Sequence, residues 1–399
     1  MLEIIISKKN QSRQIALVEN GKLVEIYEEK PDDNKNEGNI YIGTVKDILP
    51  GMQAAFLDIG TERNSFIHLK DILPQEDETN EKTAQKNQPQ DIRKVVKQGD
   101  KLLVQVKKDS NAKKGARIST HISLAGRLVV LMPNTDIITI SQKVGNDKEK
   151  QRLLEIVKSI LPENTGAVIR TAACKKTKED IEQDINLLLK KWEEIEQVAT
   201  NCKKSPQLIY KTPGVAEKLI IDLIDKKIEK IILDNKSEYE NITQMLKEYG
   251  IENSTKLELN EKTNIFDLYE IQKQKEKIES RKIWLNCGGF ITIDPTEALT
   301  AIDVNTGKYM GSNSLEDTIY KVNYEATIEI ARQLRLRDIG GIIIIDYIDM
   351  QKQENKEKIE KLLRQELKND RGKHEKAAPA LGVALLPFST LGQFVSKLE

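Results

Sequence analysis

Two short apolar runs that each end in an aspartate constrain this fold more than any other feature. Ala-Leu-Thr-Ala-Ile ends at Asp303, within Ala-Ile-Asp-Val-Asn-Thr-Gly, and Gly-Ile-Ile-Ile-Ile ends at Asp346. Short apolar runs bounded by glycine and polar residues are typical of buried strands. In open α/β sheets, ligands gather at the carboxyl ends of such strands. The pattern therefore predicts an α/β sheet with a polar site where the two strands end.

Asp303 and Asp346 are candidate ligands of a metal ion. Neighbouring strands lie about 5 Å apart, so both carboxylates reach one cation if the two strands pair. One or two carboxylates completed by water suit Mg²⁺, with Mn²⁺ as a second candidate. For either aspartate alone, the alternative is a polar residue that starts a turn. Asn305, on the same face as Asp303, favours the metal site.

Length and composition bound the class of protein. A chain of 399 residues with 38% hydrophobic and 32% charged residues predicts two to four folded units. It contains no stretch of eighteen apolar residues and does not start like a signal peptide, so we expect a cytoplasmic protein without a membrane span. Cys174, Cys202 and Cys287 never form Cys-x-x-Cys, and we expect neither disulfides nor zinc.

Local charge differs from the net charge, which is zero. Residues 101–127 contain seven Lys or Arg and one Asp. Such a stripe can neutralise several phosphates of a nucleic acid. The alternative interpretation is the solvated edge of a sheet.

The chain divides by pattern into several regions. Residues 1–36 alternate around Asn20-Gly21, the strongest short-range signal of a hairpin. Residues 39–127 hold about five short strands, as in a small barrel of the OB type, with a polar insertion at 75–90. Beyond residue 280, strands and helices alternate.

Two helices are predicted from apolar stripes at helical spacing. The first stripe is interpreted as core packing and comprises Ile181, Ile185, Leu188, Leu189, Trp192, Ile195 and Val198. The second stripe, in a helix from about 315 to 336, is expected to be buried and comprises Leu315, Ile319, Val322, Ala326, Ile330 and Leu334.

Several longer motifs resemble the catalytic region of the ribonuclease E/G family. They include Met-Gln-Ala-Ala-Phe-Leu-Asp-Ile-Gly at 52–60, Leu-Met-Pro-Asn at 131, Arg-Thr-Ala at 170, and the two segments that contain Asp303 and Asp346. The resemblance spans residues 40–373. It implies an α/β, multidomain fold, in which an OB-fold RNA-binding barrel is inserted into an RNase H-like subdomain and an α/β deoxyribonuclease-like catalytic domain follows.

The resemblance also implies domain boundaries. The RNase H-like subdomain is expected to start with residues 1–36 and to finish with 213–280. The OB-fold RNA-binding domain takes 37–125, and a region that senses a 5′-phosphate takes 126–212. The catalytic α/β domain, with an atypical C-terminal tail, takes 281–399.

By resemblance, the protein is a metal-dependent endoribonuclease that cleaves single-stranded RNA in ribosomal RNA processing and messenger RNA decay. Asp303 and Asp346 would hold Mg²⁺. Asn305 would orient the scissile phosphate or a water on the metal. One bound cation can acidify water and offset developing charge, so the mechanism needs no nucleophilic side chain.

RNA contacts are implied on the barrel. Phe56 and Phe66 lie where the family grips a base with two aromatics, although a place in the barrel core is an open alternative for each. Lys108 and Lys114 match basic RNA contacts of the family.

A pocket for a 5′-monophosphate is implied by a further group of residues. They are Gly126, Val130, Arg170 and Thr171, with Lys373 where the family has an arginine. A guanidinium beside a hydroxyl suits a terminal phosphate dianion.

Two departures from the family limit what the resemblance implies. The Cys-x-x-Cys through which two chains of the family share zinc is missing here, so any homo-oligomer would lack a zinc link. Residues 374–399 follow the family only loosely. Alternative functions are therefore a catalytically impaired RNA-binding protein of the same family and a nuclease that acts on DNA.

Overall fold

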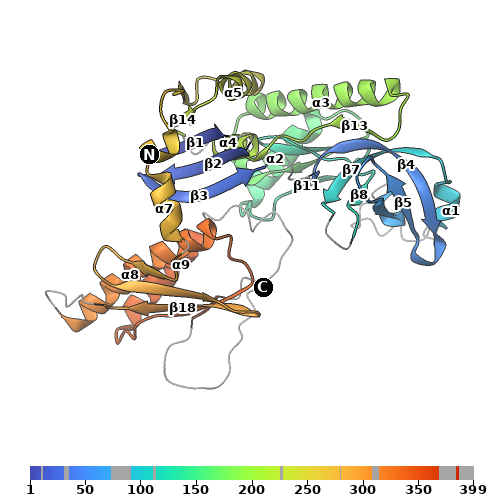
Figure 1. Ribbon diagram of the computed structural model, residues 1–399. Helices are drawn as coiled ribbons and strands as arrows, with labels where there is room; N and C mark the ends of the chain where they lie inside the picture. The colour runs from blue at the N-terminus through green and yellow to red at the C-terminus, as the bar shows by residue number, and fades with distance from the viewer. Residues whose placement is uncertain are drawn as a thin grey trace. The chain divides into compact units, whose positions relative to one another are not determined.

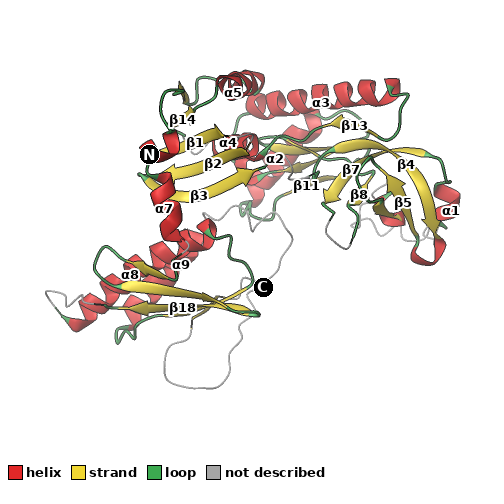
Figure 2. Cartoon of the chain, in the orientation of Figure 1, coloured by secondary structure: helices red, strands yellow, loops and turns green. Residues whose placement is uncertain are grey.

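The computed structural model describes residues 1–9, 12–30, 36–72, 91–110, 114–224, 228–278, 280–307, 314–367 and 383–385. It is a mixed α/β structure, and its sheets lie within two compact units (Figures 1 and 2). One unit comprises residues 1–28, 229–236 and 257–399, and the other comprises 29–228 and 237–256. Each unit is therefore built from segments that are distant in sequence.

A closed five-stranded barrel forms part of the second unit, consistent with an OB-fold. Its strands are β4 (Ile40–Leu49), β5 (Ala54–Asp58), β6 (Ser65–His68), β7 (Lys101–Lys108) and β8 (Arg117–Ser119). They follow one another in the order β4-β5-β6-β8-β7, and β7 closes the barrel by pairing with β4. The β6–β8 pair is parallel, whereas the other barrel pairs are antiparallel.

The barrel core follows from the two-residue period of its strands. Ala55 and Leu57 of β5, Ile67 of β6, Val104 of β7 and Ile118 of β8 are fully buried together. The short helix α1 (Ile92–Val95) adds to this core, and β13 (Gln207–Tyr210) extends the sheet beside β4. The predicted insertion at 75–90 lies outside the described residues.

A second sheet in the same unit has the order β11-β12-β10-β9. Its strands are β9 (Leu124–Ala125), β10 (Val129–Pro133), β11 (Ile138–Ile140) and β12 (Thr165–Ile169). It packs against α2 (Asp147–Ile160) and α3 (Lys178–Asn201). Thr177 and Asp180 form a capping box that explains where α3 begins.

Helix α3 confirms the predicted stripe except at its last member. Ile181, Ile185, Leu188 and Trp192 are buried, but Val198 is 47% exposed. The prediction for Val198 was wrong because the core ends before the last turn of the helix. Two more helices of this unit are α4 (Val215–Leu223) and α5 (Lys236–Glu248).

The first unit contains a sheet with the order β15-β14-β1-β2-β3. Its strands are β1 (Leu2–Lys9), β2 (Ser12–Glu19), β3 (Lys22–Glu29), β14 (Lys230–Leu233) and β15 (Lys256–Leu259). The predicted turn is confirmed, with Asn20 at φ 51° and Gly21 at φ 75°. Parallel pairing of β1 with β14 joins the N-terminus to a segment more than 200 residues later. Helices α6 (Ile265–Leu268) and α7 (Ile271–Ile278) contribute to the core beside this sheet.

The sheet that carries Asp303 and Asp346 has the order β16-β17-β18-β19-β20. Its strands are β16 (Lys282–Trp284), β17 (Phe290–Pro295), β18 (Leu299–Asn305), β19 (Ile342–Asp346) and β20 (Val383–Leu385). Helices α8 (Leu315–Leu336) and α9 (Gln353–Leu367) contribute to its core. Ile291, Ile302 and Ile345 of the sheet are buried with Val322 and Ile330 of α8. The alternate residues of these strands therefore lie on the opposite face.

Leu315 does not belong to this core, although it was predicted there. It is 75% exposed because it occupies the first turn of α8, which begins at the capping residue Ser314. The OB-type barrel is supported by the strand order, whereas the RNase H-like and deoxyribonuclease-like assignments and the domain boundaries stay predictions. Within the described residues, no helix combines the length and apolarity needed to cross a membrane.

Candidate active site and nucleic-acid interface

Asp303 and Asp346 lie side by side at the carboxyl ends of two parallel strands. Strand β18 pairs with β19 in the register that makes these two residues partners. Their neighbours Ile302 and Ile345 point into the core, so both carboxylates lie on the face opposite α8. The pairing on which the predicted site depended is thus present.

Asn305 belongs to the same group of side chains. Its Nδ2 donates a hydrogen bond of 2.6 Å to Oδ2 of Asp303. Because Asn305 is two residues further along β18, it lies on the same face as Asp303. The amide therefore fixes the orientation of that carboxylate.

A shallow pocket of about 310 Å³ surrounds these residues. It is lined by Asp303, Val304, Asn305, Thr306, Asp346, Tyr347, Ile348 and Asp349. The pKa of Asp346 is raised, first by burial and then by the negative charges of Asp303 and Asp349. Asp349 had no predicted role, although it lies three residues after Asp346 in the same motif. The pocket therefore concentrates negative charge, which a cation would stabilise.

The carboxylate oxygens of this pocket are donors of the kind that Mg²⁺ takes. Among the residues that the structure describes, no group of three or more His, Cys, Asp and Glu side chains is placed to hold a metal. Asp303 and Asp346 would then be the carboxylate ligands, and water would fill the other positions. This arrangement is usual for Mg²⁺, which keeps several waters and takes one or two carboxylates.

Phe56 and Phe66 form an aromatic pair on the outside of the barrel. They are direct partners across β5 and β6, and their ring centroids lie 6.0 Å apart at an interplanar angle of 67°. Both are partly exposed, while Ala55, Leu57 and Ile67 between them fill the core. The alternative of a core position is therefore excluded for both.

Basic residues continue this row across the barrel. Arg117 on β8 is the register partner of Phe66 on one side and of Lys108 on the other. The Arg117 guanidinium is 60% exposed and pairs with Asp71 at 3.0 Å. An aromatic pair beside guanidinium and ammonium groups is suited to single-stranded nucleic acid.

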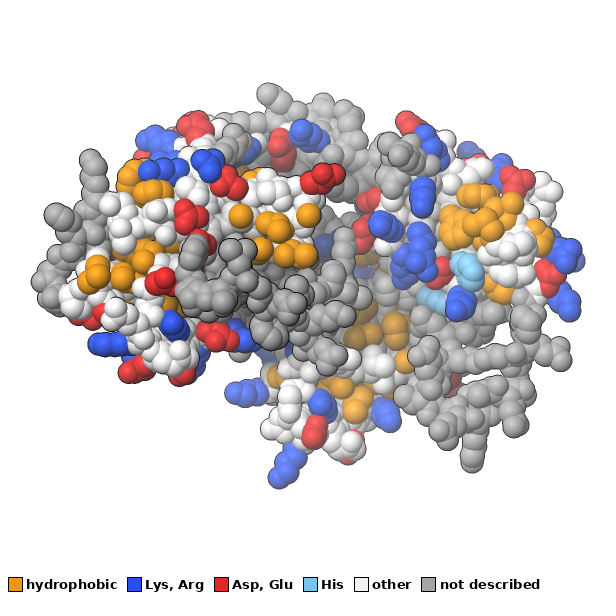
Figure 3. Space-filling model, turned by 90° about the horizontal axis from the view of Figure 1, so that it is seen from below, with side chains coloured by type: hydrophobic (Ala, Val, Ile, Leu, Met, Phe, Trp, Pro, Cys, Tyr) orange, Lys and Arg blue, Asp and Glu red, His pale blue; other side chains and the backbone are white. Residues whose placement is uncertain are grey.

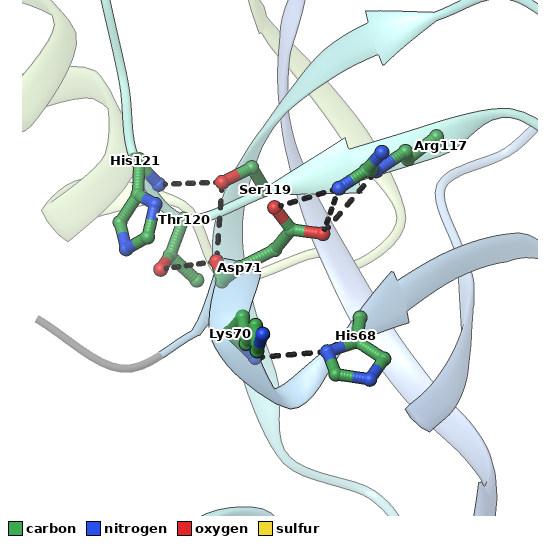
Figure 4. A network of polar contacts seen from close by, with 7 residues as sticks. All are labelled: His68, Lys70, Asp71, Arg117, Ser119, Thr120 and His121. Atoms are coloured by element: carbon green, nitrogen blue, oxygen red, sulfur yellow. Dashed lines mark hydrogen bonds and ion pairs between the residues drawn. The ribbon is translucent and has the colours of Figure 1, made fainter. Parts of the chain in front are cut away.

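Asp71 is fixed by a polar network that Figure 4 shows from close by. Its carbonyl oxygen accepts hydrogen bonds from the hydroxyls of Ser119 (3.1 Å) and Thr120 (3.0 Å). Nδ1 of His68 accepts from the backbone N–H of Lys70 at 3.1 Å. The network therefore holds in place the carboxylate that orients Arg117.

The basic stripe predicted at 101–127 is not uniform. Lys108, Lys114 and Arg117 are exposed, and Figure 3 shows Lys and Arg side chains gathered beside the histidines on one face. Lys107 instead donates to Gln105 Oε1 at 2.8 Å, and burial lowers its pKa to about 8. The solvated-edge alternative thus applies to part of the stripe only.

Four of the five residues predicted to bind a 5′-phosphate are described. Arg170 donates from Nη1 to the Gly126 carbonyl and from Nη2 to Asp222 Oδ1, each at 2.7 Å. Thr171 Oγ1 lies 3.2 Å from the Ser141 hydroxyl. The side chains of Arg170 and Asp222 are 22% and 31% exposed.

The other residues of this predicted group have separate positions. Val130 lies on β10, where it pairs with Ala125 and Val168. Lys373 lies outside the described residues. Among the described members of the group, Arg170 and Gly126 are joined by a hydrogen bond.

Asp184 stabilises the backbone after Gly126, a role that the sequence did not predict. Its buried carboxylate accepts hydrogen bonds from the backbone N–H groups of Arg127 (3.0 Å), Leu128 (2.7 Å) and Val129 (3.1 Å). A Cβ on Gly126 would lie 2.7 Å from Asp184 Oδ2, which explains the glycine. The sequence feature that could have indicated this role is an aspartate within the apolar stripe of α3, because a buried carboxylate needs hydrogen-bond partners.

Comparison with known proteins identifies the family of this chain. A profile described as the Ribonuclease E/G family matches residues 123–380. The chain belongs to the ribonuclease E/G family. The chain is 38% identical to Ribonuclease G of Salmonella typhimurium strain SL1344 over 375 residues, which cover 93% of this chain and 76% of that protein. Ribonuclease G of Escherichia coli K12 is 37% identical over 375 residues, which also cover 93% of this chain and 76% of that protein.

This ribonuclease E/G family member also matches longer relatives. Ribonuclease E of Escherichia coli K12 is 35% identical over 374 residues, which are 93% of this chain but 35% of that protein. The predicted membership is thereby confirmed. Asp303, Asn305, Asp346 and Arg170 lie within the residues 123–380 that the family profile matches.

Proposed function

We propose that this protein is a Mg²⁺-dependent endoribonuclease that cleaves single-stranded RNA at the Asp303–Asn305–Asp346 site. Its relatives are named ribonuclease G and ribonuclease E, which supports an endoribonuclease. The observation that carries the proposal is the register that pairs Asp303 with Asp346 beside Asn305. Ribosomal RNA processing and messenger RNA decay are the proposed roles. If the protein forms a homo-oligomer, its chains would associate without a shared zinc ion.

The site residues divide the work between them. A bound divalent cation would supply acidified water and a positive charge that offsets charge on the phosphate. Asp303 and Asp346 would hold that ion. The Asn305 amide keeps Asp303 oriented and lines the same pocket, where it could contact a bound phosphate. Asp349 adds negative charge that favours cation binding.

A substrate panel tests the reaction class. We expect cleavage of a single-stranded RNA and little cleavage of the same sequence as a duplex or as DNA. A catalytically impaired RNA-binding protein would bind the RNA without cutting it. Preferential cutting of the DNA would instead support the alternative nuclease.

The barrel surface is proposed to bind RNA through charge at Lys114 and through stacking at Phe56. Lys114→Ala should lower the slope of log affinity against log salt by roughly 0.7, because one fewer counterion is released. Phe56→Ala should weaken binding about tenfold with little change in slope. Fluorescence anisotropy at several salt concentrations measures both.

Lys190→Ala is the matched control, because Lys190 is an exposed lysine on α3, which is not one of the barrel elements. It should leave affinity and slope unchanged. If Lys114→Ala and Phe56→Ala changed the slope equally, the proposed division between charge and stacking would be wrong.

Arg170 is proposed to read a 5′-monophosphate. A terminal dianion suits its guanidinium, whereas a 5′-hydroxyl offers no charge. Arg170→Ala should slow cleavage of 5′-monophosphorylated RNA several-fold while leaving cleavage of its 5′-hydroxyl counterpart unchanged. Initial rates on both RNAs measure the preference, and an equal loss on both would assign Arg170 to folding or general binding.

Asp222→Asn tests whether the negative charge of Asp222 competes with a phosphate for Arg170, since the substitution removes the charge and keeps the shape of the side chain. The Asp222 carboxylate accepts a hydrogen bond from the Arg170 guanidinium, the group to which a phosphate would bind. Removing its charge should therefore raise the preference for a 5′-monophosphate, the opposite of Arg170→Ala. A loss of preference in both variants would mean that Asp222 orients Arg170 and does not compete with the phosphate.

A further inference from the structure

A row of side chains extends from the candidate active site to the edge of its sheet. Asn305 on β18 is the register partner of Phe290 on β17, which is the partner of Trp284 on β16. Direct partners of antiparallel strands point to the same face. Phe290 and Trp284 therefore lie on the face of Asp303 and Asn305, opposite α8.

A second row runs parallel to the first. Lys282 pairs with Thr292, which pairs with Asp303, the partner of Asp346. Lys282 is two residues before Trp284 and thus lies on the same face. The face of the sheet opposite α8 therefore places two aromatics and one ammonium group beside the acidic pocket.

The two aromatic rings are held in a defined geometry. Trp284 and Phe290 meet edge to face, with ring centroids 5.3 Å apart. A Cβ on Gly307 would lie 3.4 Å from Phe290 Cδ1 and 3.5 Å from Trp284 Cζ3, so the chain leaving β18 packs against both rings. Trp284 is nevertheless 59% exposed.

Lys282 gives this aromatic surface a positive charge. Its Nζ lies 4.3 Å from the centroid of the Trp284 ring and 3.5 Å from that of Phe290. A cation over one side of an exposed aromatic pair matches the two parts of a nucleotide, because the base can stack on an exposed ring and the phosphate is anionic.

We infer that Trp284, Phe290 and Lys282 form a stacking platform for a base of the substrate close to the scissile phosphate. The inference rests on the proposed function, since it assumes that RNA is cut at Asp303 and Asp346. Strands lie about 4.8 Å apart, so Trp284, two strands from Asn305, lies about 10 Å away, within one or two nucleotides. The occupant is RNA because the platform continues the rows of the acidic pocket and carries a cation.

A scan with abasic nucleotides tests the platform. Single abasic positions are placed in turn on each side of the cleavage site of a single-stranded RNA. In the wild type, we expect one or two adjacent positions to lower kcat/KM about tenfold. Trp284→Ala should lower kcat/KM on the intact RNA about tenfold. In this variant, an abasic nucleotide at the same positions should cause no further loss of kcat/KM.

Two further variants control for folding. Trp284→Phe keeps a stacking surface and should recover most of the rate. Tyr324→Ala removes another aromatic side chain, 41% exposed on α8, and should cut like the wild type. An abasic penalty that is equal in the wild type and in Trp284→Ala, or spread over all positions, would overturn the inference.

Tryptophan fluorescence provides a readout that is independent of cleavage. The chain has two tryptophans, and Trp192 is buried at 9% exposure while Trp284 is exposed. In an Asp303→Asn background, which keeps the RNA intact, binding of a single-stranded RNA should quench the emission that Trp284→Phe removes. Unchanged emission at saturating RNA would contradict stacking on Trp284.

The outcomes also separate this inference from the function on which it rests. If Asp303→Asn cut normally, the proposed active site would fail whatever Trp284 does. If Asp303→Asn were inactive and Trp284→Ala behaved as the wild type, the platform alone would fail. A change of oligomeric state in Trp284→Ala would assign the face to a second copy of the chain and overturn the inference.

Discussion

Asp303→Asn and Asp346→Asn should each lower the rate of RNA cleavage by on the order of a hundredfold or more, with RNA binding retained. Each substitution keeps the shape of the side chain but removes a negative charge and a ligand of high affinity for Mg²⁺. The two residues are register partners at one sheet edge, so neither can replace the other without moving its strand. Single-turnover kinetics and anisotropy on the same RNA separate cleavage from binding.

Asp294→Asn is the matched control for these variants. Asp294 lies on β17 of the same sheet, pairs with Arg281, and does not line the pocket. It should cut near the wild-type rate. Near-normal cleavage by Asp303→Asn and Asp346→Asn as well would show that the reaction takes place elsewhere.

Asp184→Ala should destabilise the protein by about 3–5 kcal/mol, because it leaves buried backbone N–H groups without their acceptor. The carboxylate is 4% exposed and accepts from three successive N–H groups, those of Arg127, Leu128 and Val129. Loss of this acceptor would also loosen the turn at Gly126, whose carbonyl binds Arg170. Urea unfolding followed by circular dichroism measures the change in the free energy of unfolding.

Asp180→Ala provides the comparison on the same helix. Asp180 belongs to the exposed capping box of α3, and its loss should cost about 1 kcal/mol. The difference between the two variants isolates the buried hydrogen bonds. A cost below 1 kcal/mol for Asp184→Ala would mean that water or a rearranged turn satisfies the three N–H groups.

The sequence predicted the parts of the site that depend on local pattern. Asp303, Asn305 and Asp346 follow apolar runs whose strand character is set by their own residues. The places of Phe56 and Phe66 could not be decided in this way, because an aromatic in a strand fits either face of a barrel. The paired register of β5 and β6 was needed to place both outside.

Contacts between distant segments could not be predicted. Asp222 meets Arg170 across 52 residues, and Asp184 meets Leu128 across 56. Both aspartates lie in helices. The helical period predicts on which face of the helix a residue lies, but not which distant segment packs against that face. Trp284 was missed for a similar reason, since its place beside Asn305 depends on two successive strand pairings.

Metal dependence of RNA cleavage tests the central claim most directly. The purified protein is incubated with a 5′-monophosphorylated, A/U-rich single-stranded RNA in EDTA, after which Mg²⁺ is added in excess. If Asp303 and Asp346 form the Mg²⁺ site, we expect intact RNA in EDTA, internal cleavage once Mg²⁺ is added, and no such recovery in Asp303→Asn. Equal cleavage in EDTA and in Mg²⁺, or equal cleavage by Asp303→Asn, would contradict this claim.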